Sequence, residues 1–361
     1  MIGPTATVDL DAVGHNAGEW HRFLAPKELW AVVKSDGYGL GATDVARAAL
    51  SGGATRLCVI ELDEAKRLRH AGIRAPIVQV AATPPSDFFE ALDLDVAVTL
   101  ENWRAADTLD KTALKKKTRA AAHVAIDCGT GWSGLQAPDV RNFAKQAARL
   151  EHIRWEGVWT HLGGPRGAPD QIATFGRAVE TLREAGLRFQ YQHVASTAPA
   201  IGGAPGDAAR IGIGLFGSTM GERSLALDLR TALTVRASVA SVKRFESASA
   251  LGYGGTARAE PGAVVATLRL GYADGLPRGL ANRGLALFGA ERCKIVGAIG
   301  MNFTFVMLPA HFDVSAGDEC LIVGEADGIR LDDVASAANT IPHELCTSFS
   351  RIRSLSPSRP A

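Results

Sequence analysis

Short apolar runs rich in β-branched residues alternate with helix-like segments from residue 29 to residue 215, and this alternation restricts the possible fold most strongly. The runs are Leu29–Val33, Arg56–Ile60, Ile77–Val80, Val96–Thr99, Ala122–Asp127, Trp155–Thr160, Tyr191–Ala195 and Ile211–Leu215. The segments between them show helical spacing, as in Ala42–Leu50, Glu61–His70, Asp139–Leu150 and Gln171–Ala185. Strands that alternate with helices form a parallel sheet, so eight such units predict an α/β fold of the (β/α)8 TIM-barrel type.

The pattern changes after about residue 226, where Gly, Pro and Asp separate short strand-like runs. These runs are Ala232–Val242, Ala263–Leu270, Leu285–Leu287, Cys293–Ile299, Thr304–Leu308 and Glu319–Val323. One short helix is expected at Leu331–Ala338, with two aspartates near its start. We therefore expect a barrel over residues 11–225 and a mostly β C-terminal domain over residues 226–361.

Composition excludes several classes of function. Apolar residues make up 47% and charged residues 21% of the 361 positions, and the net charge is +1. These values are ordinary for a soluble globular protein and predict neither a nucleic-acid partner nor a membrane surface. The five cysteines are scattered without metal-ligand spacing, so we expect free thiols and no metal site. Without a signal-like N-terminus or a long apolar stretch, the sequence predicts a cytoplasmic protein.

Lys34 is the most prominent candidate for chemistry. It follows the first predicted strand and precedes the glycine-rich segment Ser35–Gly41. A lysine at the end of a buried strand is desolvated, which lowers its pKa and favours a nucleophilic amine. Glycines after it let a ligand approach the backbone closely. This arrangement suits a Schiff-base lysine, although an ordinary lysine that ends a strand would also fit the position alone.

Other polar residues follow the predicted strands and should meet at the same face of the barrel. Asp127 ends the fifth strand, His161 follows the sixth, Thr197 follows the seventh, and Arg210 introduces the eighth. Active sites of TIM barrels lie at the carboxyl ends of the strands. Lys34 and these residues therefore mark one candidate site.

Three motifs resemble those of the alanine racemase family, whose members use pyridoxal 5'-phosphate (PLP). They are the segment around Lys34 (residues 31–42), the segment Arg210–Gly217, and the segment Gly271–Arg278. Motifs that occur in the family order over such a distance are more specific than any one of them alone. The resemblance covers essentially the whole chain. It implies that residues 1–10 belong to the second domain, with a strand at Ala6–Leu10. It also implies that the protein is a homodimer with active sites shared between chains.

The resemblance also implies two acid/base residues on opposite sides of the substrate α-carbon. Lys34 would hold PLP covalently and exchange the α-proton on one side, while Tyr253 would exchange it on the other. The other cofactor-binding residues implied by the resemblance are Tyr38, His161, Thr197, Arg210, Gly212, Ile213 and Ser350. Among them, Arg210 would face the pyridine nitrogen, and Ser350 would stand at a phosphate-binding tyrosine position.

The implied substrate-binding residues are Tyr272, Met301 and Trp132. Tyr253, Tyr272 and Met301 would act on Lys34 of the other chain. The sequence departs from the family where Ala125 and Trp132 replace a lysine and an arginine that help to bind the substrate carboxylate, and where Asn302 and Ser350 replace an aspartate and a tyrosine. Joint loss of a paired lysine and arginine indicates a rebuilt pocket.

Several interpretations remain open at this point. The first is a PLP-dependent racemase or epimerase that interconverts L and D amino acids, with a substrate that need not be alanine. The second is another PLP reaction at the α-carbon, such as decarboxylation, aldol cleavage or transamination. A PLP carrier without enzymatic activity would not need the second domain. A Schiff-base aldolase without PLP would leave the Gly271–Arg278 motif unexplained.

Overall fold

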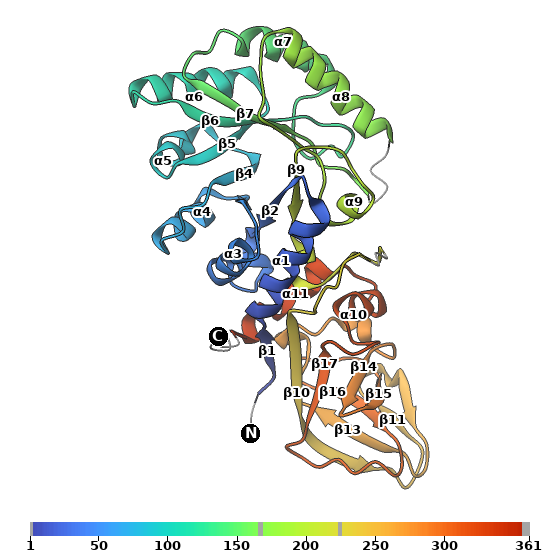
Figure 1. Ribbon diagram of the computed structural model, residues 1–361. Helices are drawn as coiled ribbons and strands as arrows, with labels where there is room; N and C mark the ends of the chain where they lie inside the picture. The colour runs from blue at the N-terminus through green and yellow to red at the C-terminus, as the bar shows by residue number, and fades with distance from the viewer. Residues whose placement is uncertain (1–2, 165–168, 223–225, 356–361) are drawn as a thin grey trace.

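The computed structural model describes residues 3–164, 169–222 and 226–355, which form a barrel and a β-sheet domain joined end to end (Figure 1). Eight parallel strands make up the barrel sheet, in the order β8-β7-β6-β5-β4-β3-β2-β9. Their bounds are β2 (Glu28–Val32), β3 (Arg56–Val59), β4 (Ile77–Ala82), β5 (Val96–Leu100), β6 (Ala120–Ala125), β7 (Ile153–Trp159), β8 (Tyr191–His193) and β9 (Ala208–Ile211). Isolated bridges close the barrel between β8 and β9, including Ala195 with Ala209. The predicted TIM-barrel fold is confirmed.

Helices connect the strands on the outside of the barrel. They are α1 (Leu10–Leu24), α2 (Lys34–Tyr38), α3 (Ala42–Ser51), α4 (Leu62–His70), α5 (Phe88–Asp93), α6 (Trp103–Lys115), α7 (Ala137–Ala147), α8 (Pro169–Glu184) and α9 (Thr197–Ile201). Local sequence fixes their starts. At α6, for example, the side chain of Asn102 accepts a hydrogen bond from the Ala105 amide at 2.9 Å, as an N-cap residue should.

The eighth barrel strand lies earlier in the sequence than the predicted run Ile211–Leu215, so the prediction that Arg210 precedes this strand is wrong. Strand β9 ends at Ile211, and residues Ile213–Phe216 form a 3-10 turn, η2. Arg210 therefore lies inside the strand, paired in register with Trp30 of β2. The physical reason is the glycine at position 212, whose backbone (φ −113°, ψ −86°) leaves the extended conformation and starts the turn.

The C-terminal domain is an antiparallel-rich sheet in the order β13-β16-β15-β14-β17-β10-β1-β18. Its strands are β1 (Thr5–Val8), β10 (Leu233–Arg244), β13 (Val264–Leu268), β14 (Leu285–Phe288), β15 (Glu291–Val296), β16 (Thr304–Leu308), β17 (Glu319–Val323) and β18 (Arg353–Leu355). A separate hairpin pairs β11 (Ser249–Leu251) with β12 (Ala257–Ala259). Strand β1 pairs with both β10 and β18, so the first and last strands of the described residues are neighbours in this sheet.

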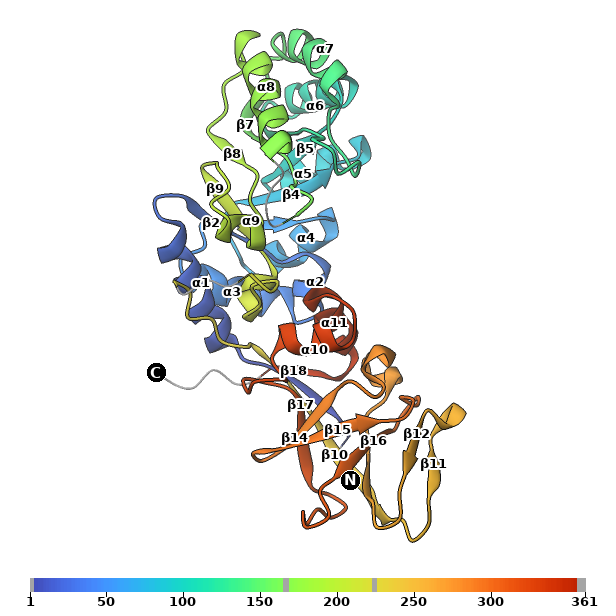
Figure 2. The same ribbon diagram turned by 90° about the vertical axis from the view of Figure 1, so that its right-hand side faces the viewer.

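Two short helices, α10 (Leu331–Ala337) and α11 (Pro342–Ser348), lie between the sheet of the C-terminal domain and the barrel (Figures 1 and 2). The sequence analysis predicts α10 but not α11 or β18. Helices α10 and α11 are equally short, and the two aspartates near its start distinguish α10. Where the chain divides between the two domains stays a proposal, with the boundary at residues 225 and 226. No helix among the described residues is long and apolar enough to span a membrane.

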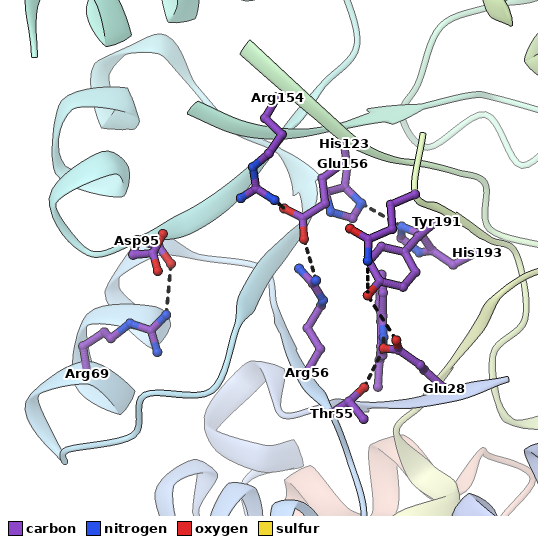
Figure 3. Close-up of polar contacts among 12 residues, drawn as sticks. Glu28, Thr55, Arg56, Arg69, Asp95, His123, Arg154, Glu156, Tyr191 and His193 are labelled. Atoms are coloured by element: carbon purple, nitrogen blue, oxygen red, sulfur yellow. Dashed lines mark hydrogen bonds and ion pairs between the residues drawn. The ribbon is translucent and has the colours of Figure 1, made fainter. Parts of the chain in front are cut away.

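Polar side chains from several barrel strands, among them Glu28, Arg56, Glu156 and Tyr191, lie close together (Figure 3). Arg56 forms a buried ion pair with Glu156, and the Tyr191 hydroxyl donates a hydrogen bond to Glu28 at 3.0 Å. Trp30 lies above them, with the Arg56 guanidinium 4.7 Å from its ring centre. Arg56 and Glu156 each need the other as a charge partner, because removing one would leave an unpaired buried charge and strongly destabilise the protein.

Candidate active site

Lys34 lies at the carboxyl end of β2 and opens a turn of left-handed helix. Positive φ angles run through the next five residues, from Ser35 (φ 53°) to Gly39 (φ 78°). Left-handed backbone costs about 1–2 kcal/mol for each residue other than glycine, so Ser35, Asp36 and Tyr38 are held there by their surroundings. The turn reverses the chain within one strand spacing. It thereby returns Tyr38 to the same end of the barrel as Lys34.

Residues from two distant elements hold this turn. Glu64, buried near the start of α4, accepts hydrogen bonds from the amides of Ser35 and, at 2.9 Å, Ile60. Arg353 of β18 donates to the Asp36 carboxylate at 2.6 Å and to the Gly39 carbonyl at 2.9 Å. The C-terminal strand is therefore fastened directly to the loop that carries Lys34.

The environment of Lys34 lowers the pKa of its amine. Burial lowers the pKa of Lys34, the nearby Glu64 carboxylate raises it, and the Arg210 guanidinium lowers it, with a net decrease. No described residue forms a hydrogen bond or ion pair with the Lys34 amine at the distances of such contacts. A lowered pKa makes the amine easier to deprotonate, which suits a nucleophilic lysine.

Arg210 is buried in β9 and fixed by acceptors around its terminal nitrogens. It donates to His193 Nδ1 at 2.7 Å, to the His193 carbonyl at 2.6 Å and to the Thr160 carbonyl at 2.9 Å. No described residue accepts a hydrogen bond from its Nε–H, which leaves that donor for a ligand. Burial lowers the pKa of Arg210 to about 10, so the guanidinium is still charged at neutral pH.

Arg210 also sets the protonation of two buried histidines. A guanidinium can only donate, so His193 Nδ1 must accept and its proton lies on Nε2. That Nε2 is 2.9 Å from His123 Nδ1, which accepts in turn and carries its own proton on Nε2 (Figure 3). Burial holds the pKa of both histidines well below the ordinary value. Both rings are therefore neutral. The hydrogen bonds that run from Arg210 through His193 to His123 fix the orientation of the Arg210 guanidinium.

A small polar cradle lies where β9 turns into η2. The Tyr38 hydroxyl lies so close to Gly212 that a Cβ at position 212 would be 2.0 Å from it. Ile213 follows at the start of η2, and the buried Thr197 hydroxyl accepts a hydrogen bond from the Gly214 amide at 3.3 Å. Tyr38, Thr197, Gly212 and Ile213 thus come together, as expected from the sequence.

Trp132 and His161 form an aromatic stack near Lys34. Trp132 lies in the loop after β6 and is 79% exposed, yet its ring stacks on His161 with centres 5.5 Å apart and planes 13° apart. The Asp127 carboxylate organises this loop by accepting from the amides of residues 129, 130 and 131. Burial, Arg210 and Lys34 lower the pKa of His161 to about 4, so the ring is neutral.

Tyr253, Tyr272 and Met301 lie on the C-terminal domain and are exposed. The exposed fractions are 81%, 44% and 55%. Tyr272 and Met301 belong to neighbouring loops joined by backbone hydrogen bonds, including Ala273 N to the Met301 carbonyl at 2.9 Å. Tyr253 follows β11, whose hairpin lies at the end of the domain that is remote from the barrel (Figures 1 and 2). A single chain therefore does not bring Tyr253 to its own Lys34.

Three neighbours of the lysine turn escaped the sequence analysis: Glu64, Arg353 and His343. His343, near the start of α11, has its ring 5.5 Å from that of Tyr38. Ser350, expected at the phosphate site, instead packs its Cβ near Gly39 and is exposed. Its role stays a prediction. Only a capping pattern around Glu64 was visible in the sequence, and nothing local marked the other two.

Comparison with known proteins agrees with this geometry over the whole chain. The family models for the alanine racemase N-terminal and C-terminal domains match residues 8–220 and 232–355. An alanine racemase of Symbiobacterium thermophilum is 34% identical over 356 residues, which are 96% of this chain and 94% of that protein. The structure of an alanine racemase from Streptomyces lavendulae, a producer of D-cycloserine, superposes with a TM-score of 0.92 at 30% identity, covering 99% of this chain and 98% of the other.

An alanine racemase from Bartonella henselae, solved with covalently bound pyridoxal phosphate, superposes with a TM-score of 0.87 at 25% identity. The match covers 98% of this chain and all of the other, 100%. Both family models together leave only short segments of this chain unmatched. This chain belongs to the alanine racemase family.

Proposed function

We propose that this protein is a PLP-dependent amino-acid racemase that exchanges the α-proton between Lys34 of one chain and Tyr253 of a second copy. One observation carries the proposal: the unpaired Lys34 amine is desolvated beside the Arg210 guanidinium, at the carboxyl ends of the barrel strands. Nucleophilic lysines of this kind hold carbonyl cofactors. Family membership supports the same chemistry.

The residues around Lys34 fit PLP. No Cβ can stand at position 212 without displacing the Tyr38 hydroxyl, and this hydroxyl offers a hydrogen-bond donor beside Gly212 for a phosphate. Arg210 offers an Nε–H without an acceptor among the described residues, and this donor could bind the ring nitrogen of the cofactor. Lys34 would hold the aldehyde carbon, and the Tyr38 side would hold the phosphate.

PLP supplies an electron sink that acidifies the α-hydrogen of a bound amino acid. Lys34 is the proton acceptor and donor on one side, because its lowered pKa leaves the amine free to take a proton at Nζ. Racemisation needs a second group on the opposite side, since one base alone returns the proton to the side from which it came. Tyr253, exposed on the C-terminal domain, is available to a second copy of the chain.

Arg210 would determine the protonation state of the cofactor's ring nitrogen. Its guanidinium would disfavour protonation of a cofactor ring nitrogen placed beside it, because two neighbouring positive charges repel. The hydrogen bonds to His193 prevent it from turning away. Proton return to the α-carbon is thereby favoured over side reactions that need a stronger electron sink.

We propose further that the preferred substrate differs from alanine. Trp132 and Ala125 occupy the positions of an arginine and a lysine that help to bind a carboxylate in the family. Trp132 offers an exposed apolar face stacked on a neutral His161 instead. An aromatic face of this size favours a larger or apolar side chain.

An absorption spectrum before and after borohydride, followed by a screen of amino acids in deuterated water, tests the proposal. Wild type should lose the PLP absorption on reduction and then carry the cofactor on Lys34, as peptide mapping would show. Lys34→Ala should carry none at that position. A racemase incorporates deuterium at the α-carbon and yields both enantiomers without a new compound. Release of a decarboxylated or cleaved product would refute racemisation.

The double variant Ala125→Lys with Trp132→Arg tests the substrate assignment. Alanine exchange should rise relative to exchange of larger amino acids, because the pocket regains a carboxylate partner. Trp103→Arg is the matched control, since Trp103 is an exposed tryptophan at the start of α6. Equal preference for alanine in wild type and double variant would contradict a rebuilt pocket.

A further inference from the structure

His343 has a buried ring nitrogen that the protein does not satisfy. Its Nδ1 is buried without a hydrogen-bond partner among the described residues. Such atoms are rare, because an unmade hydrogen bond in a buried position costs about 1–3 kcal/mol. His343 comes from the C-terminal domain, so nothing in the barrel sequence anticipates it at this position.

The ring lies against the phosphate side of the proposed cofactor site. It packs at a centroid distance of 5.5 Å and an interplanar angle of 51° on Tyr38, whose hydroxyl lies at the Gly212 cradle. His343 and His161 influence each other electrostatically, and both are influenced by Lys34. His343 therefore lies near Lys34, Tyr38 and His161.

We propose that His343 is a positioning residue that takes up one proton when PLP binds and donates a hydrogen bond from Nδ1 to the phosphate. This inference rests on the proposed PLP-dependent function. The proton comes from solvent, and no covalent bond is made or broken. A phosphate monoester carries a charge of about −1.5 to −2 at pH 7, so a protonated imidazole gains a strong charge-assisted hydrogen bond.

The free protein keeps His343 neutral. Burial and then the charge of Lys34 lower the pKa of His343 to about 4. Lys34 and Tyr38 face it from α2, and His161 faces it from the loop after β7. In the neighbouring helix α10, the Asp332 carboxylate accepts a hydrogen bond from the Ser218 hydroxyl. In the 3-10 turn η6 (Phe349–Ile352), Arg351 donates a hydrogen bond to the Ala273 carbonyl. The bound phosphate would thus supply the negative charge that the surrounding protein lacks.

Calorimetric titration of the apoprotein with PLP and with pyridoxal tests this proposal. Pyridoxal lacks the phosphate but forms the same bond with Lys34, so proton changes at the lysine cancel in the comparison. Each titration is run at pH 7.5 in Tris and in HEPES, whose different ionisation enthalpies report the protons taken up. Phosphate buffer is avoided because it would compete for the site.

Wild type should take up about one proton more with PLP than with pyridoxal, as linkage requires for a group whose pKa rises on binding. His343→Gln keeps a donor that cannot titrate, so the extra proton should disappear. His343→Leu should bind PLP about tenfold or more weakly and pyridoxal unchanged. His311→Gln, at an exposed histidine, is the control.

Equal losses of affinity for PLP and pyridoxal in His343→Leu would show a merely structural role and overturn the inference. Persistence of the extra proton in His343→Gln would do the same, and this variant serves if the leucine variant does not fold. If wild type binds neither ligand and borohydride fixes nothing to Lys34, the proposed function fails as well. Binding of PLP without a phosphate-specific effect at His343 removes this inference alone.

Discussion

Gly212→Ala should disturb the cofactor cradle more than any other single methyl group in the barrel. The added Cβ would lie 2.0 Å from the Tyr38 hydroxyl oxygen and 2.8 Å from its Cζ, so the hydroxyl must retreat by about 1 Å to reach even the shortest real contact. Tyr38 cannot turn freely, because its ring packs on Phe216 and His343. Overpacking of this kind costs about 1–3 kcal/mol.

Displacement of the Tyr38 hydroxyl should have two measurable effects. With an unfolding entropy of about 2.1 cal/mol/K per residue, a loss of 1–3 kcal/mol lowers the Tm of a chain of this length by about 1–4 °C. Loss of a hydrogen bond to a charged group weakens PLP binding by about 10–150-fold. Thermal unfolding of the apoprotein and titration with PLP measure the two effects separately.

The matched control is Gly176→Ala in α8, where a Cβ meets nothing within 4 Å. It should leave both quantities unchanged or raise Tm slightly, since alanine favours helix. Combining Gly212→Ala with Tyr38→Phe removes the atom in the closest clash, so Tm should recover while PLP affinity stays low. If Gly212→Ala behaves like its control, the close approach of Tyr38 to residue 212 is refuted.

Two further predictions concern the supports of the site. The buried His123 and His193 have depressed pKa values in the folded state, so the unfolded chain alone binds protons below about pH 6.5 and stability is lost as pH falls. At pH 5.5 the pair should cost about 3 kcal/mol relative to pH 8, and a Tm that is flat over this range would contradict neutral rings. Arg353→Leu removes two hydrogen bonds to the lysine turn, so residues 33–42 should exchange amide hydrogens faster, as mass spectrometry would detect. Arg353→Lys, which keeps the charge, should show a smaller increase, and unchanged exchange in both variants would rule out this restraint.

The sequence predicts the fold because the evidence for each strand and helix is local. Strand-forming runs at Thr304–Leu308 and Glu319–Val323 match the observed strands residue for residue. The position of Lys34 at a strand end follows from the apolar run before it. Resemblance to a family supplied the chemistry that such a position alone leaves open.

Local patterns fail where a glycine changes the backbone or an element is short. The strand expected at Ile211–Leu215 ends at its first residue, because Gly212 starts a turn there. Helix α11, like α10, is only seven residues long, and it lacks the pair of acidic residues in the first turn that marks α10 in the sequence. His343 therefore remained outside the expected site.

The sequence by itself determined which segments become strands and helices and which lysine follows the first barrel strand, since those properties depend on neighbouring residues. Only the tertiary structure decided which side chains surround that lysine. Arg353 reaches Asp36 across 317 positions of sequence, and Arg210 fixes the proton positions of His193 and His123 through direct contacts. Desolvation and hydrogen-bond donors act over a few ångströms in space, and separation along the chain contains no measure of that distance.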